Sequence, residues 1–233
     1  MSLQSNSTDA ASDIEVLGRL SSGRFTCRAY RSTPVPDEVI ASIVEIARKT
    51  ASWCNVQPWQ LLIASRETTE RFRQALMEHA KQANGVDSDI PFPTEYRGAF
   101  ADRRREAGYR LYEALGIDRS EKERRAAQGF ENFRMFGAPH VAIVTIPAEL
   151  GPYAGVDCGA FIGSFLLAAH AHGVSTTPQG ALAQHAGFIR SYFGIGDDRK
   201  MVCGISFGYA DPDHPVNGFR TSRIPLDEVM RIV

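Results

Sequence analysis

The sequence predicts a single α+β domain in which helices flank one sheet. Its 233 residues are 43% hydrophobic, which is enough apolar material for one sizeable core. Three apolar runs bounded by proline or glycine are typical of buried strands, at residues 59–64, 141–146 and 201–210. Helical patterns separate these runs, near residues 67–82, 155–172 and 183–193. We therefore expect one domain over residues 14–233.

The chain opens with a small, polar stretch, MSLQSNSTDAASD. We expect residues 1–13 to be a disordered lead-in, because they offer little apolar surface to bury. The first helix is expected after the sequence RSTPVP, where Ile40 and Ile43 recur at helical spacing. Asp37 stands in its first turn, where the helix dipole favours negative charge, and the pattern ends near Thr50.

The stretch between Gly85 and Gly137 differs in composition from the rest. Arginines interleave with acidic residues at spacings of three and four, which supports exposed helices through opposite-charge pairs. We expect residues 85–136 to form a solvated helical excursion from the domain. A second interpretation stays open, in which aromatic side chains of this stretch wall a substrate channel: Tyr96, Phe100, Tyr109 and Tyr112.

The segment AGVDCGAFIGSFLLAAHAHG, residues 154–173, is apolar enough to raise the question of a membrane span. Small residues dilute its apolar content and Asp157 lies inside it, so a buried core helix is the better interpretation. Gly155, Gly159 and Gly163 recur every four residues and leave one helix face without side chains. Such a face suits a close helix–helix contact, including one between subunits.

Several classes of function are disfavoured. The net charge of −1 and the pI near 6.6 provide no basic field for a nucleic-acid backbone. No G-x-G-x-x-G follows a strand and no Walker-type loop is present, so neither a Rossmann dinucleotide site nor nucleotide hydrolysis is supported. His170 and His172 are two residues apart and cannot share a metal on one helix face, so we expect no metal site.

The four cysteines are widely spaced and include no C-x-x-C pair. The chain does not open with the basic and apolar regions of a secretory signal. Together these features predict a reduced, cytoplasmic protein with no membrane partner. We expect Cys27 and Cys54 to be small buried residues rather than activated thiols, because no histidine lies near either in the sequence.

The stretch SSGRFTCRAYRSTPVP, residues 21–36, carries Arg24, Thr26 and Arg28 at a spacing of two. In an extended chain all three side chains point to one face and present two guanidinium groups and a hydroxyl together. The pattern predicts an anion-binding site. Arginines on a solvated stretch of chain would be the default interpretation if no other segment agreed.

Other segments do agree. The stretch TASWCNVQPWQLLIAS, residues 50–65, places Trp53, Asn55 and Trp59 in a turn before a strand, where a mere connector would use Gly, Ser and Asp. Five segments together resemble the FMN-dependent nitroreductase family in order and spacing. They are this stretch, GRFTCRAYRSTPVP, RMFGAPHVAIVTI, DCGAFIGSFLLAAHAHGVSTTPQGAL and PVNGFRTSRIPLDEV. The resemblance runs from about Gly23 to the C-terminus and is strongest to the subgroup that reduces nitroaromatic compounds.

The resemblance implies a nitroreductase-like fold, with a central mixed, mainly antiparallel sheet flanked by helices, in an intertwined homodimer. It implies a tightly bound FMN at the seam between two copies, with NAD(P)H as co-substrate. The glycine-bearing helix and the C-terminal tail would contribute to a large apolar dimer interface.

The resemblance also implies which residues hold the FMN phosphate. Arg24, the backbone of Phe25 and the hydroxyl of Thr26 would hold the phosphate and ribityl end. Arg223 matches the second phosphate arginine of the family, and Arg220 would help it. Guanidinium groups suit this task because their planar forks match phosphate oxygens in pairs.

Other positions match residues around the flavin ring. Arg28 matches a cation near the N1–C2 carbonyl edge, where it would favour the reduced flavin. The sequence STTPQGAL matches the loop over the ring near N5, where glycine lets the backbone approach closely. Many relatives carry Glu in place of Gln179. The matching loop residues are Thr177, Pro178, Gln179 and Gly180.

Ser52, Trp53 and Asn55 match the segment that reaches the flavin of the partner subunit. Asn55 would hydrogen-bond a polar flavin edge or the ribityl group, and Trp53 would offer a flat apolar wall. The family more often has a small residue where Trp53 stands, so this side chain is expected to affect the width of the pocket and the choice of substrate.

The implied activity is the two-electron reduction of a nitroaromatic acceptor by NAD(P)H in a ping-pong sequence. The flavin would carry the hydride, so no side chain is expected in that role. Three alternatives stay open: a reductase of quinones or activated alkenes in the same fold, a non-catalytic flavin-binding protein, and oxidative fragmentation of the flavin itself.

Overall fold

A four-stranded sheet lies at the centre of the computed structural model, which describes residues 7–233. The strand order is β1-β2-β4-β3, and the three neighbouring pairs are antiparallel. The expected, mainly antiparallel sheet is therefore confirmed. The strands are β1 (Gln60–Ser65), β2 (His140–Pro147), β3 (Ser175–Gln179) and β4 (Arg199–Gly208).

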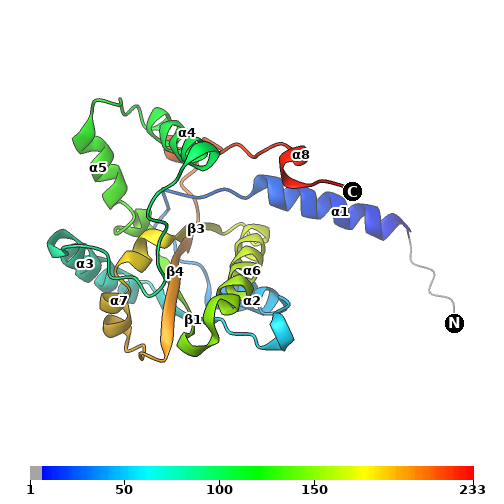
Figure 1. Ribbon diagram of the computed structural model, residues 1–233, viewed down its shortest axis with the longest axis horizontal. Coiled ribbons are helices and arrows are strands. Elements are labelled where there is room, and N and C mark those ends of the chain that lie inside the picture. The colour runs from blue at the N-terminus through cyan, green and yellow to red at the C-terminus, as the bar shows by residue number, and fades with distance from the viewer. Residues whose placement is uncertain (1–6) are drawn as a thin grey trace.

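Helices cover both faces of the sheet (Figure 1). Ala142 and Val144 of β2 face one apolar layer, and Val141 and Ile143 face the other. This alternation follows from the pleat of a strand, and β2 is apolar on both sides because it is central in the sheet. One layer is built on α2 (Asp37–Ala47) and α6 (Gly151–Ala171), the other on α3 (Glu67–Gln82) and α7 (Ala186–Phe193).

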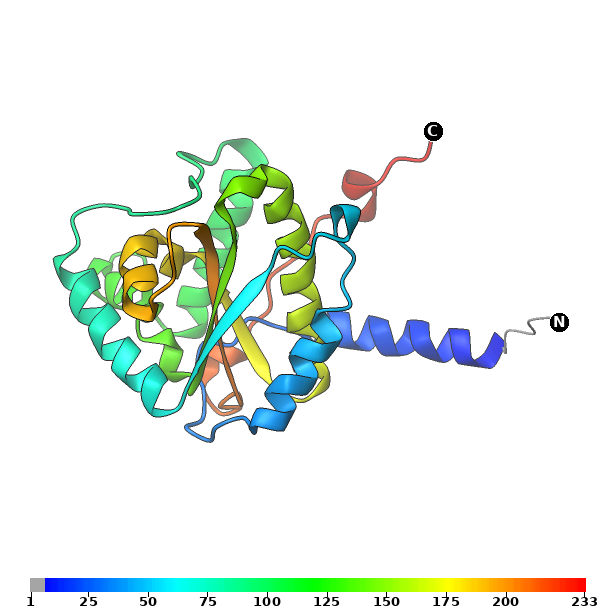
Figure 2. The ribbon, with the colours of Figure 1, turned by 90° about the horizontal axis from the view of Figure 1, so that it is seen from below.

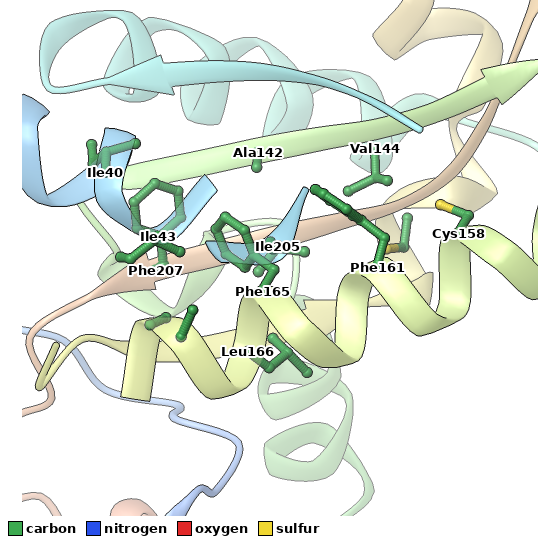
Figure 3. Packing of buried hydrophobic residues seen from close by; sticks show 14 of the residues in the cluster. Ile40, Ile43, Ala142, Val144, Cys158, Phe161, Phe165, Leu166, Ile205 and Phe207 are labelled. Carbon is green, nitrogen blue, oxygen red and sulfur yellow. The ribbon is translucent and has the colours of Figure 1, made fainter. Parts of the chain in front are cut away.

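The larger apolar cluster lies between α6 and the sheet (Figure 3). Phe161 and Phe165 point from α6 toward Ile205 and Phe207 of β4, and all four are fully buried. Trp59, just before β1, stacks on Phe161 with ring centroids 4.9 Å apart. Each buried side chain of this size contributes about 1.5–3 kcal/mol, so this face of α6 is a main source of stability.

The opposite face of α6 is largely exposed. Tyr153 and Val156 are about two-thirds exposed. A methyl group built on Gly159 or Gly163 would find no atom within 4 Å. By length and apolar composition the segment Ala148–Ala171 could also cross a membrane, yet its sheet-facing side chains are part of the core.

Helix α1 (Ser7–Gly23) begins inside the stretch that the sequence assigned to a disordered lead-in. Residues 7–13 are helical, whereas residues 1–6 of that stretch lie outside the described range. Once a helix forms over residues 14–23, adding residues at its start is cheaper than nucleating a new turn. Helix α1 projects from the body in both views (Figures 1 and 2), and its side chains Ile14 and Leu17 are exposed.

The charged excursion contains an extended strap followed by two helices. Residues 83–97 run without helix between α3 and α4, so the prediction of a helical excursion over residues 85–136 is wrong for residues 85–97. No side chain of α4 or α5 is fully buried. The chain is completed by α4 (Gly98–Ala114), α5 (Lys122–Phe130), α8 (Leu226–Val229) and the short 3-10 turns η1 (Trp53–Asn55), η2 (Met135–Gly137), η3 (Ala148–Leu150), η4 (Gly180–Gln184) and η5 (Pro215–Asn217).

Candidate functional site

Two segments far apart in the sequence, residues 21–28 and 219–223, meet at a pocket of about 220 Å³. The end of α1 and the segment after it form one wall, and the tail that follows η5 forms the other. Residues far apart in the sequence thus face one space, as the resemblance implied. The lining residues are Ser21, Ser22, Arg24, Phe25, Thr26, Arg28, Phe219, Arg220, Thr221 and Arg223.

The pocket is strongly cationic. Among the ion pairs of the described residues, none involves Arg24, Arg28, Arg220 or Arg223. Partial burial, and then the charge of Arg223, hold the pKa of Arg24 below its usual value. Burial likewise lowers the pKa of Arg28. Four guanidinium groups without a carboxylate leave a positive charge that a bound anion would balance.

Aromatic rings hold two of these arginines in place. The guanidinium of Arg220 lies 4.1 Å from the centre of the Phe25 ring, and that of Arg28 lies 5.7 Å from the Phe219 ring. Each ring comes from the wall opposite its arginine, so these contacts tie the two walls together. Arg220 also donates hydrogen bonds to the carbonyls of Asn217 and Phe219, both at 2.8 Å.

Asn217, which was not predicted as a site residue, joins the two walls more directly. Its Oδ1 accepts a hydrogen bond from the backbone N–H of Arg28 at 2.9 Å. Its Nδ2 donates to the carbonyls of Ala29, at 2.9 Å, and Asp211, at 2.8 Å. The only signal in the sequence is an Asn–Gly pair in a turn before the arginines.

Strand β3 pairs with this segment, and three of its five residues are buried: Thr176, Thr177 and Gln179. Thr26 bridges Thr176, and the N–H of Cys27 donates to the Thr176 carbonyl at 3.1 Å. Thr177 points inward, where its hydroxyl lies 2.7 Å from that of Tyr30. The side chain of Thr177 thus contacts the protein interior, which leaves the backbone of this residue to face the loop that the resemblance places over the flavin ring.

Gln179 is also directed inward. Its Oε1 accepts a hydrogen bond from the hydroxyl of Ser206, and its Nε2 donates to the carbonyl of Asn132 at 2.8 Å. The amide thus binds β3 to β4 and to the turn before η2. Pro178 is half-buried and Gly180 is exposed, so of the four loop residues these two face outward.

The turn containing Ser52, Trp53 and Asn55 lies elsewhere. None of the three lines the arginine pocket of the same chain. The N–H of Trp53 donates to both oxygens of Asp157 on α6, at 3.1 and 3.2 Å, and its ring lies 5.3 Å from that of Tyr153. The turn therefore sits at the exposed face of α6.

The backbone of this turn is strained. Cys54, Asn55 and Gln57 all have positive φ, at 49°, 57° and 51°. Residues with a side chain adopt this conformation at a cost of about 1–3 kcal/mol each, and such strain concentrates at binding sites. Cys54 is exposed, so the expectation that it is a small buried residue is wrong, whereas Cys27 is buried as expected.

A second pocket, of about 290 Å³, lies on the other side of Arg28 beneath α5. Leu115, Ile117 and Arg124 line it, together with Val216 near the tail. The aromatic residues that the sequence suggested as channel walls, Tyr96, Phe100, Tyr109 and Tyr112, line neither this pocket nor the arginine pocket.

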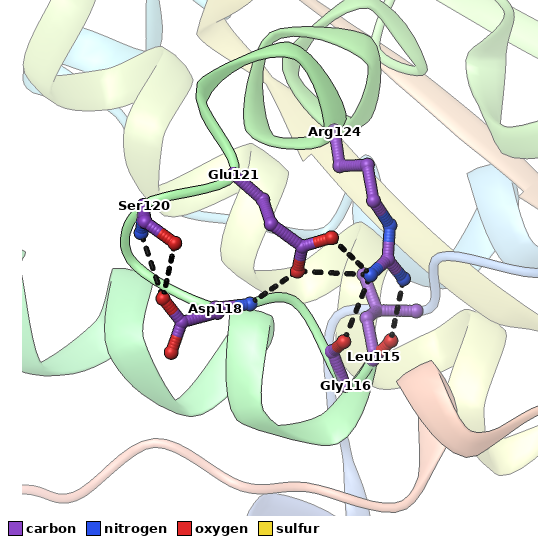
Figure 4. Close-up of polar contacts among 6 residues, drawn as sticks. All are labelled: Leu115, Gly116, Asp118, Ser120, Glu121 and Arg124. Atoms are coloured by element: carbon purple, nitrogen blue, oxygen red, sulfur yellow. Dashed lines mark hydrogen bonds and ion pairs between the residues drawn. The ribbon is translucent and has the colours of Figure 1, made fainter.

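Local polar contacts shape the turn between α4 and α5 that borders this pocket (Figure 4). Arg124 donates to both carboxylate oxygens of Glu121, at 2.8 and 2.9 Å, and to the carbonyl of Gly116 at 3.1 Å. Asp118 accepts from the N–H and the hydroxyl of Ser120, at 2.9 and 2.7 Å. Arg124 is thus occupied within the turn, which leaves Arg28 as the cation shared by both pockets.

The donor set of the arginine pocket fits a phosphorylated ligand. Arg24 and Arg223 can each present two N–H groups to phosphate oxygens, and the hydroxyl of Thr26 adds a neutral donor. Arg28 lies between this pocket and the next, where a planar group attached to the phosphate would need a cation at its edge. A flavin mononucleotide has this combination of a phosphate and a planar ring.

Known proteins share both the sequence and the fold. The sequence pattern of the Nitroreductase family matches residues 22–209. The chain is 36% identical over 215 residues to nitroreductase NfnB of Mycolicibacterium smegmatis, covering 91% of each protein. It is 32% identical over 200 residues to a 4-nitrobenzoate reductase of Pseudomonas putida, covering 86% of this chain and 88% of that one.

The crystal structure of the FMN-dependent nitroreductase NfnB from Mycobacterium smegmatis in complex with NADPH superimposes with a TM-score of 0.89. That match covers 94% of this chain and 99% of the other, at 34% identity. Family pattern, relatives and fold agree over nearly the whole chain. The chain therefore belongs to the nitroreductase family.

Proposed function

We propose that this protein is an FMN-dependent, NAD(P)H-oxidising nitroreductase of nitroaromatic compounds. The observation that carries the proposal is the pocket in which four arginines from two distant segments face one space, none of them in an ion pair with another described residue. Two relatives support the choice of cofactor, co-substrate and acceptor. One is named a 4-nitrobenzoate reductase, and the other is an FMN-dependent nitroreductase whose crystal structure contains NADPH.

Within the proposal, the pocket residues bind and orient the cofactor. Arg24 and Arg223 hold the phosphate, Thr26 and the Phe25 backbone hold the neighbouring hydroxyl groups, and Arg220 adds charge while stacking on Phe25. Charge-assisted hydrogen bonds of this kind contribute about 1.5–3 kcal/mol each. Asn217 keeps the two walls at the correct separation through its three hydrogen bonds.

The remaining residues act on the planar part of the ligand. Arg28 places a positive charge at the border of the two pockets, where it stabilises negative charge that develops on reduction. Pro178 and the exposed backbone of Gly180 form the surface against which a ring can lie. Bound FMN would supply two-electron hydride transfer from NAD(P)H to the acceptor. The products from a nitroarene would be the nitroso and then the hydroxylamino compound.

The proposal includes a homodimer with sites between its subunits. The exposed face of α6 carries Gly155, Gly159 and Gly163, and a second backbone can approach it closely. The turn of Ser52, Trp53 and Asn55 lies on this face, so Asn55 and Trp53 would complete the pocket of the partner. The C-terminal tail, with Ile232 exposed, would add to the interface.

Three alternatives predict different measurements. A quinone or alkene reductase of the same fold would prefer those acceptors in a panel, and a non-catalytic flavin protein would be yellow without oxidising NAD(P)H. Oxidative fragmentation of the flavin would show as flavin loss under oxygen. A cytoplasmic location is part of the proposal and is supported by four free cysteines.

Anaerobic titration of the purified protein tests the proposed function. The flavin absorbance is expected to bleach on addition of one equivalent of NADPH per flavin and to recover on addition of 4-nitrobenzoate. A protein that binds no FMN, or whose bleached flavin is not reoxidised by any nitroarene, would contradict the proposal.

A further inference from the structure

The strap of residues 83–97 is fixed to the fold at two carboxylates. The first is Asp87, whose backbone accepts from the N–H of Ala186 and donates to the carbonyl of Gln184, both at 2.8 Å. Its Oδ2 accepts from the N–H of Gly187 at 3.1 Å, at the start of α7. A carboxylate at this end of a helix is favoured by the free N–H groups and the helix dipole.

The second fixing point is Asp89. Its Oδ2 accepts from the backbone N–H of Met201 on β4 at 2.7 Å and pairs with Arg190 Nε at 3.1 Å. Both side chains of this pair are largely buried, at 13% and 17% exposure. Arg190 has a second partner, Asp197, at 2.6 Å, whose side chain is 99% exposed. The Asp89 carboxylate thus ties the strap to Arg190, whereas the second partner of Arg190, Asp197, lies outside the strap.

Beyond Asp89 the strap brings Phe92 to Gly180, in the loop that the resemblance places over the flavin ring. A methyl group built on Gly180 would lie 3.6 Å from Cε1 of Phe92, which is ordinary van der Waals contact. Phe92 is 39% exposed, so one part of the ring packs toward Gly180 and another part is open. A half-exposed aromatic ring beside an exposed glycine forms a wall of a binding surface.

We propose that Phe92 determines which aromatic acceptors fit beside the Gly180 loop, and that Asp89 is a positioning residue that keeps Phe92 there. The inference rests on the proposed function, because it takes Gly180 to lie beside the cofactor. A smaller side chain at position 92 would admit wider ring systems, and a larger one would exclude them. Weakening the contacts of Asp89 would reduce the discrimination between narrow and wide acceptors, although the Phe92 ring would remain intact.

Variants at position 92 test the wall. In the FMN-loaded protein, Phe92→Ala is expected to raise the ratio of kcat/KM for 1-nitronaphthalene to that for nitrobenzene at least fivefold, and Phe92→Trp to lower it. Benzoate and 2-naphthoate carry no nitro group, and their dissociation constants are measured by perturbation of the flavin spectrum. The affinity for 2-naphthoate relative to benzoate should rise in Phe92→Ala and fall in Phe92→Trp. Val86→Ala, on the same strap but before both fixing points, serves as the control.

Asp89→Asn and Asp197→Asn form a matched pair, since each neutralises one partner of Arg190. Only Asp89→Asn is expected to increase hydrogen exchange of residues 86–92 in the cofactor-free protein and to reduce acceptor discrimination in the loaded enzyme. Equal exchange in the two variants would overturn the role of Asp89.

Acceptor ratios and naphthoate affinities within twofold of wild type in both Phe92 variants would overturn the role of Phe92. The proposed function fails separately, if the FMN-loaded wild-type protein reduces no nitroarene. The two acid ligands would still test the wall in that case.

Discussion

Arg223 lies close enough to Arg24 for its charge to lower the pKa of Arg24, although one residue follows α1 and the other belongs to the C-terminal tail. Two cations held together without a carboxylate repel one another. This repulsion lowers the stability of the free protein and is relieved when an anion binds. The pocket is therefore preorganised for a ligand with more than one negative charge.

Arg223→Ala is expected to weaken FMN binding about tenfold or more. The loss of charge-assisted hydrogen bonds of about 1.5–3 kcal/mol corresponds to this factor, because 1.4 kcal/mol is tenfold. Quenching of FMN fluorescence by the cofactor-free protein measures the dissociation constant. Arg71→Ala, at an exposed arginine of α3, is the control for lost charge alone. Equal affinity in Arg223→Ala and wild type would remove Arg223 from the phosphate site.

Arg28→Ala is expected to lower the two-electron potential of the bound flavin. If the cation favours the reduced ring by about 2 kcal/mol, the midpoint falls by about 40 mV, since about 30 mV of a two-electron couple equals 1.4 kcal/mol. Equilibration with a reference dye under xanthine oxidase gives the potential. Arg28→Lys keeps the charge and should shift it less. A potential that does not move in Arg28→Ala is the contrary result.

Gly159→Leu is expected to convert the protein to monomers that lose FMN. The new side chain would stand on the exposed face of α6, where no atom of the same chain lies within 4 Å, so folding of the single chain is not impeded. Light scattering coupled to size exclusion measures the mass. Gly129→Leu, on α5 with equally open surroundings, is the matched control and should leave a dimer. A Gly159→Leu protein that remains dimeric would argue against this interface.

His140 is expected to make the protein less stable in mild acid. Its Nε2 accepts a hydrogen bond from the N–H of Val35 at 2.8 Å, and burial, followed by the charge of Arg66, lowers its pKa to about 4. Between about pH 6.5 and 4 the unfolded chain binds a proton that the folded chain does not. The free energy of unfolding therefore falls as the pH drops through this range.

Urea unfolding of wild type and His140→Asn at pH 7.5, 6 and 5 measures this dependence. The variant is less stable at pH 7.5 but should lose less stability between pH 7.5 and 5. Equal losses in the two proteins would show that another group is responsible.

The regular elements with strong patterns could be predicted from the sequence. Helix α3 has the expected bounds, residues 67–82, and β1, β2 and β4 agree to within two residues. Strand β3 was missed because its sequence, STTPQ, contains a proline and no apolar alternation. It is stabilised by pairing with β4, and such long-range pairing is not visible in local sequence.

The site was predicted only in part. The spacing of Arg24, Thr26 and Arg28 indicated an anion site, but only the family resemblance brought Arg223 to it. The inward direction of the Gln179 side chain depends on the register of β3 against β4, where it pairs with Gly204. A shift of one residue would have turned it outward. Register follows from tertiary packing, so sequence alone could not decide it.

Helices α4 and α5 bear no fully buried side chain, and their ion pairs at three- and four-residue spacing are local, so both helices should open well before the sheet melts. Their amide hydrogens should exchange in a separate, faster phase than those of β2 and β4. The protein would thus have two regions of different local stability, a stable sheet with its packed helices and a less stable pair of helices, α4 and α5. Mutations in α4 and α5 could accumulate with little loss of the global free energy of unfolding.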